Sequence, residues 1–199
     1  PSRENQRQFY DRLEDALRAV PRVEQVGATN QLPGDPDPMI SGLRISVDGL
    51  PPVTESNRWF ALRLVATPDY FRAVGIDSLA GRSFTNADRG GTPRVAIVSE
   101  GVAVAVGLLP REIVGRRLDF GSSYRERLVE VVGVVRNVRL HGPEKDVDLA
   151  IYLPDLGRSY SSPRIVIKAG GEPRQIIPPV RAAVARLDPA LPLYRIRTF

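Results

Sequence analysis

The 199-residue sequence contains no cysteine and a single histidine, His141. A zinc site needs several His or Cys ligands together, so the composition excludes that class of metal site as well as thiol chemistry. The lack of cysteine fits a reducing compartment and equally fits a disulfide-free bacterial extracytoplasmic domain, so it does not decide the location. We expect no metal and no cofactor.

Lysine is almost absent as well: Lys145 and Lys168 are the only two, and the other 26 basic residues are arginine. A P-loop requires Gly directly before Lys, but these lysines follow Glu144 and Ile167, which excludes Walker-type nucleotide binding. No two glycines have the G-x-G spacing of a dinucleotide fingerprint, and no serine lies in G-x-S-x-G. We therefore expect a protein that is not an enzyme.

One catalytic grouping can still be imagined around the histidine. His141 with Asp146 or Asp148 and a serine would supply the residue types of a triad. A triad is defined by geometry, however, and a loop histidine beside Gly142 and Pro143 is the favoured interpretation.

Two acidic segments, residues 35–37 and 146–148, resemble the start of a calcium loop. Met39 and Ala150 stand where the next ligand is required, and neither segment has Glu at the twelfth place, so solvated turn carboxylates are the better interpretation. We nominate no catalytic, cofactor-binding or metal-binding residue. An enzyme that uses carboxylates stays a distant third alternative.

The net charge of +5 is unevenly distributed, with −2 in residues 1–60, +4 in residues 61–140 and +3 in residues 141–199. The densest group of arginines comprises Arg116, Arg117, Arg125, Arg127, Arg136 and Arg139. Acidic residues alternate with them, which favours an ion-paired sheet face first and a site for acidic partners such as lipid headgroups second. The aromatic-basic pattern of an RNA-recognition strand and a recognition helix are lacking, so we expect no nucleic-acid partner.

The first third of the chain begins with an amphipathic helix over residues 3–20. Its apolar stripe consists of Phe9, Leu13, Leu17 and Val20. Alternating apolar residues then predict strands over residues 23–29, 43–47 and 58–66. Proline excludes regular structure between the first two strands.

The middle of the chain alternates strands with short helices. Thr67 as N-cap and Gly75 as stop bracket a short helix, and Ser99 is placed to cap a second helix over residues 100–106. Strands are predicted over residues 95–98, 115–120 and 128–135. The last of these is apolar on both faces, which is typical of a central strand.

The last third repeats the helix-then-strand order of the beginning. After short strands at residues 152–153 and 165–168, an apolar stripe predicts a helix that ends at Leu187, with Pro178 and Pro179 in its first turn. Residues 193–197 are predicted to form a strand. This imperfect repeat indicates an α+β domain with helices on one face of a sheet.

Six segments, in this order and spacing, resemble the MacB-type periplasmic core domain of FtsX-like ABC transporter permeases. They are residues 67–76 (TPDYFRAVGI), 80–85 (AGRSFT) followed by Asp88, 95–100 (VAIVSE), 113–118 (IVGRRL), 131–138 (VVGVVRNV) and 151–154 (IYLP). One departure is the run at residues 101–110 (GVAVAVGLLP), where the family usually carries a more polar, arginine-bearing helix. A buried helix is the favoured interpretation of that run, and a contact surface for a partner is the alternative.

The resemblance implies a porter-like, split helix-strand sheet domain with a smaller α+β subdomain inserted. We expect residues 1–67 and 128–199 to form the two halves of the porter-like part and residues 68–127 to form the insertion. The chain would be an extracytoplasmic, periplasmic segment of a longer inner-membrane protein, with both of its ends at the same end of the porter-like part.

In such a permease a separate cytoplasmic ABC ATPase hydrolyses ATP, and the outer domain transmits the conformational change to a substrate or a partner. A periplasmic protein or a second permease copy is the expected partner, and movement would occur at two crossings, near residues 66–67 and 127–128. The alternative is a stand-alone extracytoplasmic module that binds a peptide or a lipid.

Overall fold

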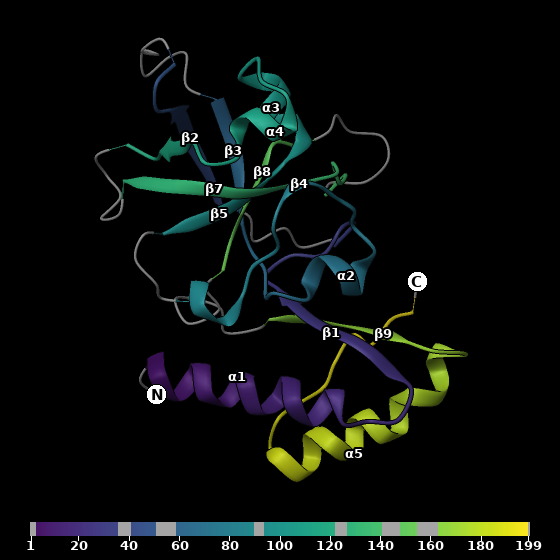
Figure 1. The fold of residues 1–199 in the computed structure, drawn as a ribbon. Coiled ribbons are helices and arrows are strands. Elements are labelled where there is room, and N and C mark those ends of the chain that lie inside the picture. Colours follow the sequence, from purple (N-terminus) through teal and green to yellow (C-terminus); the bar gives the residue numbers. More distant parts are fainter. Residues whose placement is uncertain are drawn as a thin grey trace.

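The computed structural model describes residues 3–35, 41–50, 59–89, 94–121, 127–140, 148–154 and 163–198. Two layers are visible in Figure 1. The first, here called the helical layer, consists of α1 (Arg3–Arg18), β1 (Val23–Thr29), β9 (Arg164–Ala169) and α5 (Ile177–Leu187). The second, the sheet layer, contains the remaining strands. The expected mixed α+β class is confirmed.

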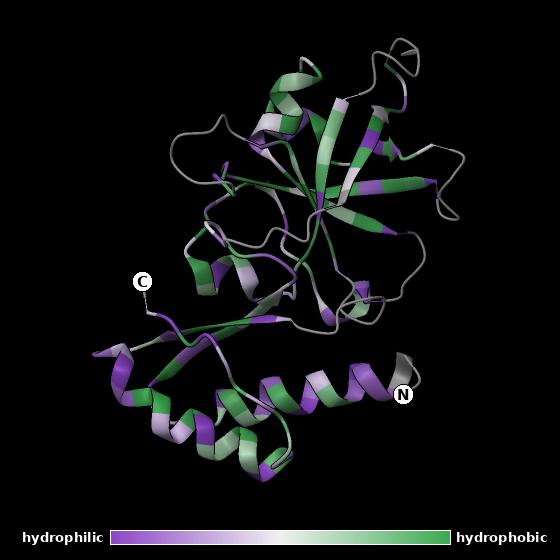
Figure 2. Ribbon diagram, turned by 180° about the vertical axis from the view of Figure 1, so that it is seen from behind, coloured by the Kyte–Doolittle hydropathy of each residue, from purple (hydrophilic) through white to green (hydrophobic). Residues whose placement is uncertain are grey.

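The helical layer is built on a two-stranded antiparallel ribbon. β1 pairs with β9 from Val23 opposite Ala169 to Thr29 opposite Arg164. On one side of the ribbon α1 and α5 pack together through an apolar cluster centred on Leu13, Leu17, Val26 and Val184. Hydrophobic and hydrophilic residues alternate along both helices (Figure 2). Pro178 and Pro179 lie in the first turn of α5, as predicted.

In the part of the chain that the structure describes, the sheet layer contains seven strands in the order β4-β7-β5-β8-β3-β2-β6. Their bounds are β2 (Ser41–Val47), β3 (Trp59–Val65), β4 (Ser78–Gly81), β5 (Val95–Ser99), β6 (Arg117–Asp119), β7 (Leu128–Val135) and β8 (Ala150–Leu153). Because β6 pairs with both β2 and β7, six of the strands close into a ring of hydrogen-bonded neighbours, and β4 adds to the free part of the edge of β7. The prediction that residues 128–135 form a central strand is confirmed.

Short helices cover the sheet layer. α2 (Tyr70–Val74) lies between this layer and the ribbon, whereas α3 (Glu100–Ala105) and α4 (Pro110–Ile113) lie at the far end (Figure 1). Single turns occur at η2 (Asn86–Asp88) and η3 (Pro173–Ile176). α1 and α5 lie on the same side of the ribbon, as predicted for the helices of the repeated helix-strand units, whereas α2, which falls within residues 68–127, lies on the other side.

The strand pairing groups the chain differently from the subdomains expected from the sequence. β4, β5 and β6 lie within residues 68–127, yet they pair with β7, β8 and β2 from outside that range. Within the described residues, the strand pairing between the helical layer and the sheet layer is limited to an isolated bridge between Thr29 and Ala66. The boundaries at residues 67 and 128 stay a prediction.

Two predicted caps have other roles. The N-cap of α2 is Asp69, not Thr67, and Gly75 ends the helix with a φ of 82°, as predicted. Ser99 is the N-cap residue of α3, as predicted, but its hydroxyl makes no bond to the helix and instead accepts a hydrogen bond from the backbone N–H of Ala150.

The apolar run around α3 has two sides. Val102, Ala103 and Val106 are buried in the core of the sheet layer, as a buried helix requires. Val104 and Leu109 face solvent, with exposed fractions of 66% and 51%. One side of the run therefore packs in the core, and the other side forms an exposed apolar surface.

The C-terminal strand predicted at residues 193–197 is not formed. Arg195 has a φ of 57°, which interrupts the extended backbone that the alternating residues suggested. Both ends of the chain belong to the helical layer, but they lie apart along it, the N-terminus at the start of α1 and the C-terminus beside β9 (Figure 1). Within the residues that the structure describes, no helix combines the length and apolarity of a membrane span.

Gly27 allows α2 to approach the ribbon closely. A Cβ at this position would lie 2.4 Å from Tyr70 Cα, which is backbone and cannot move aside without displacing α2. We expect Gly27→Ala to lower the free energy of unfolding by about 2 kcal/mol, as overpacking does in a close-packed interior. Urea unfolding measures the loss. Gly34→Asn is the control, because its φ of 69° suits Asn and no atom lies within 4 Å; equal effects of the two substitutions would contradict the close approach.

Candidate functional site

The two layers are joined by hydrogen bonds between the end of β1 and the segment that leads from β3 to α2. The backbone N–H of Thr67 donates to the carbonyl of Ala28 at 3.0 Å, and the N–H of Ala28 donates to the Thr67 hydroxyl at 2.8 Å. The N–H of Val65 donates to Asn30 Oδ1 at 2.7 Å. We call these residues, 28–31 and 65–67, the joint. All of them are buried, so these bonds are shielded from water.

Aromatic residues pack beside the joint. The ring of Tyr152 lies 4.9 Å from that of Phe71, edge to face, and 6.2 Å from that of Tyr70, measured between centroids. Burial raises the pKa of both tyrosines well above the ordinary value, so their hydroxyls stay neutral. This packing holds α2 against the sheet layer on one side. On the other side the lack of a side chain at Gly27 lets α2 lie close to the ribbon.

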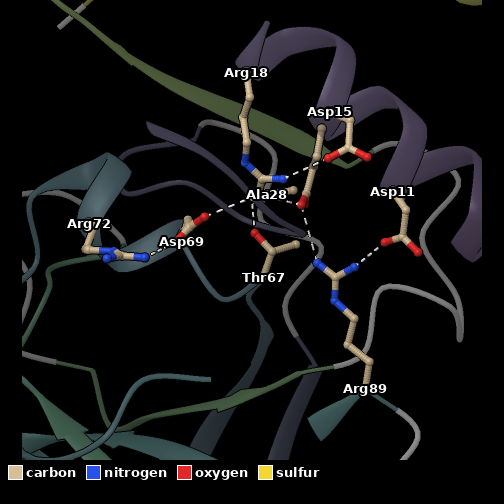
Figure 3. A network of polar contacts seen from close by, with 9 residues as sticks. Asp11, Asp15, Arg18, Ala28, Thr67, Asp69, Arg72 and Arg89 are labelled. Atoms are coloured by element: carbon tan, nitrogen blue, oxygen red, sulfur yellow. Dashed lines mark hydrogen bonds and ion pairs between the residues drawn. The ribbon is translucent and has the colours of Figure 1, made fainter. Parts of the chain in front are cut away.

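A second connection between the layers is ionic and runs through Arg89 (Figure 3). Its guanidinium, only 9% exposed, donates to Asp11 and, at 3.4 Å, to Glu14 of α1. Glu14 is 5% exposed and also accepts from Arg18, whose guanidinium reaches Asp69 at the start of α2 at 3.2 Å. Burial raises the pKa of Glu14, and the neighbouring Arg89 and Arg18 oppose that rise. α1 is thereby tied to two separate segments that extend from the sheet layer.

Arg89 is held in position by the turn that precedes it. Gly81 enters the turn with a φ of 72°, and a Cβ there would lie 2.2 Å from the carbonyl oxygen of Val132. Phe84 is buried against Phe71, with ring centroids 6.4 Å apart. Any other residue at Gly81 would push the turn away from the sheet, because backbone atoms of β7 occupy the space.

The end of the same turn is closed by Asp88. Its carboxylate accepts hydrogen bonds from the N–H and hydroxyl of Thr85 at 2.7 and 2.9 Å, and from both terminal nitrogens of Arg82 at 2.8 and 2.9 Å. These bonds, those from Arg82 foremost, lower the pKa of Asp88 to about 2. These hydrogen bonds hold the end of the turn, residues 82–88, in the conformation that places Arg89 beside α1.

The residues considered as catalytic or calcium ligands have structural contacts where the structure describes them. Asp148 accepts from the N–H of Leu140 at 3.3 Å, and Asp35 accepts from Arg164 of β9 at 2.8 Å. The other candidates, His141, Asp37 and Asp146, lie outside the described residues.

The dense group of arginines is mostly neutralised. Arg117 pairs with Asp48 at 2.7 Å, and Arg127 pairs with Asp119 at 2.6 Å. Arg136 lies 3.4 Å from Asp77. For these residues the ion-paired sheet face is the correct interpretation, whereas Arg125 lies outside the described residues.

The ionic connection can be tested with Arg89→Ala. This substitution leaves the buried Glu14 with Arg18 alone, and breaking one partner of a buried pair costs about 3 kcal/mol. We expect a loss of that size in the free energy of unfolding, measured in urea. The matched control is Arg117→Ala, whose pair with Asp48 is half exposed and should contribute less than about 1 kcal/mol. A loss for Arg89→Ala no larger than for the control would contradict the buried connection.

The low pKa of Asp88 predicts an acid-dependent stability. Because the folded-state pKa, about 2, lies below the ordinary 3.8, Asp88 stabilises the fold above pH 4 and loses this contribution as the pH falls towards 2. We expect Asp88→Asn to remove about 1 kcal/mol of the difference in unfolding free energy between pH 4.5 and pH 2.5. Asp77→Asn is the control, because Asp77 is an exposed carboxylate with a long contact to Arg136. Identical pH profiles for both variants would refute the prediction.

Comparison with solved structures identifies the fold. The periplasmic region of MacB from Actinobacillus actinomycetemcomitans is similar with a TM-score of 0.58 and 15% identity, over 88% of this chain and 72% of that one. A domain of a putative permease protein from Porphyromonas gingivalis has a TM-score of 0.55 and 16% identity, over 85% and 73%. The extracellular domain of the noncanonic ABC-type transporter YknZ from Gram-positive bacteria has a TM-score of 0.54 and 18% identity, over 89% and 81%.

Comparison with curated proteins gives no match. The family comparison gives a match to the MacB-like periplasmic core domain over residues 1–187, which is nearly the whole chain. The chain therefore belongs to the MacB-like periplasmic core domain family.

Proposed function

We propose that this domain is a non-catalytic transmitter that carries ATP-driven movement of a parent ABC permease from the helical layer to the sheet layer. Members of the family are transporter components, which supports a mechanical role. The observation that carries the proposal is the joint, where Thr67 and Ala28 exchange two buried hydrogen bonds. In this proposal the parent lies in the inner membrane, the domain is periplasmic, and a cytoplasmic ATPase supplies the energy.

The mechanism follows from where the two layers are attached. Between β1 and the sheet layer the backbone contact is a single bridge, and a single bridge restrains sliding more than rotation. Arg89 adds a second attachment, to Asp11 and Glu14 on α1. Together with the contact of Arg18 with Asp69, these attachments on different elements make a tilt of α1 turn the sheet layer with it, whereas the bridge alone would let the layers rotate against each other.

The recipient of this movement is proposed to be a periplasmic protein or a second permease copy. The exposed apolar surface formed by Val104 and Leu109 lies on the sheet layer, at the end away from α1. Apolar side chains at the extremity of a moving layer are suited to contact a partner.

The transmission can be measured without knowing the substrate. The parent permease, with its ATPase and with no other reactive cysteine, is reconstituted in nanodiscs and carries a dye on Val104→Cys and acceptor dyes on the lipids. We expect nucleotide to change the energy transfer between residue 104 and the bilayer. Combining Thr67→Val, which removes one hydrogen bond of the joint, with Arg89→Gln should abolish at least half of that change while ATP hydrolysis continues.

Arg117→Gln is the control for this experiment, because it removes an exposed ion pair outside the joint. A nucleotide-dependent signal that survives in the Thr67→Val, Arg89→Gln variant, shown by circular dichroism to be folded, would overturn the proposed route. The stand-alone binding module stays an alternative prediction that no described contact favours.

A further inference from the structure

Three arginines on the outer side of the helical layer differ from those of the sheet layer in their surroundings. Arg174 of η3 and Arg181 and Arg186 of α5 are exposed. Within the part of the chain that the structure describes, none of the three makes an ion pair or a side-chain hydrogen bond. Their charge is therefore available to an external anion.

Nearby carboxylates do not neutralise these arginines. The sequence contains no Asp or Glu from residue 173 to residue 187. The flanking Glu172 and Asp188 accept hydrogen bonds from backbone N–H groups, at 3.4 Å from Arg174 and 2.9 Å from Ala190. On the neighbouring α1, Glu14 and Asp15 pair with Arg18. Within the described residues, none of these four carboxylates makes an ion pair with Arg174, Arg181 or Arg186.

The surface beside Arg186 is a groove lined mainly by small apolar side chains. A shallow groove of about 270 Å³ runs between α1 and α5 and is lined by Ala16, Ala19, Val20, Pro21, Pro179, Ala182 and Arg186. The lining side chains are small, except for the arginine at the end of α5. α5 itself forms the edge of the molecule on the side away from the sheet layer (Figure 1). A flat anionic surface can therefore approach this helix without meeting bulky side chains.

We propose that this face, defined by Arg174, Arg181, Arg186 and the α1–α5 groove, binds the headgroups of anionic phospholipids. Charge complementarity decides the occupant: guanidinium groups bind phosphate oxygens in a bidentate manner, and a bilayer presents many phosphates in one plane. A second copy of this chain is a poorer match, because its net charge of +5 repels the same arginines. The proposal depends on the proposed function only for the nearness of a membrane.

The test uses the 199-residue chain and vesicles of phosphatidylcholine with or without 30% phosphatidylglycerol, in co-sedimentation at 0.15 M salt. We expect binding to the anionic vesicles only. Each Arg near such a surface contributes about fivefold to binding, so the variant Arg174→Gln, Arg181→Gln, Arg186→Gln should bind at least tenfold more weakly. The charge-matched control is Arg111→Gln, Arg117→Gln, Arg136→Gln, which changes three exposed arginines of the sheet layer and should bind like the parent chain.

Three results would overturn the proposal. The first is that the parent chain does not bind anionic vesicles. The second is that the two triple variants weaken binding equally, which would assign the effect to net charge. The third is that the Arg174, Arg181, Arg186 variant loses self-association without any lipid binding, which would assign the face to a second copy. Thermal unfolding of both variants checks that they are folded. Because no ATPase is present, this experiment can fail while the nucleotide-dependent signal of the parent permease persists, and the reverse.

Discussion

The exchange of two hydrogen bonds between Thr67 and Ala28 is the constraint on which the arrangement of the two layers depends. It fixes where the chain leaves β3, and so where α2 starts. α2 then has to lie against Gly27, at a distance that excludes any Cβ. Phe71 of the same helix receives Phe84, and the turn that carries Phe84 ends at Arg89, which returns to α1. Each of these contacts depends on the position that the preceding contact gives to the chain.

The ionic part of the site serves orientation more than stability. Burial of Glu14 is costly, as its raised pKa shows, and a buried ion pair seldom stabilises a fold more than apolar residues of the same volume would. An apolar replacement would, however, allow α1 to rotate about its axis or slide along the ribbon. The carboxylates of Asp11 and Glu14 accept the two ends of one planar guanidinium, which specifies both the rotation and the height of α1.

Elements with a clear local signal were predictable from the sequence, whereas pairings between distant segments were not. β1 and β7 have the predicted bounds, since their alternation or continuous apolarity is a property of neighbouring residues. The closure of the ring by β6 was not predicted, because three residues carry no information about partners as distant as β2. Thr67 carries a strong cap signal, yet its hydroxyl binds Ala28, since a side chain that can cap a helix can equally bind a strand. The burial of Glu14 had only a weak signal in the sequence, namely a charged residue that lies between Leu13 and Leu17 of the apolar stripe.

The number of arginines in a segment likewise did not predict where arginines without an ion-pair partner lie on the surface. The sequence is densest in arginine near residues 116–127, and the alternating acidic residues predicted an ion-paired sheet face there first and a site for acidic partners second. In the structure Arg117 and Arg127 lie opposite carboxylates, so that density produces a neutral, hydrogen-bonded sheet face. α5 has fewer arginines, but it contains no acidic residue, and within the described residues its Arg181 and Arg186 make no ion pair. An arginine is available for binding when folding brings no carboxylate to it, and this depends on tertiary structure rather than on how many arginines a segment has.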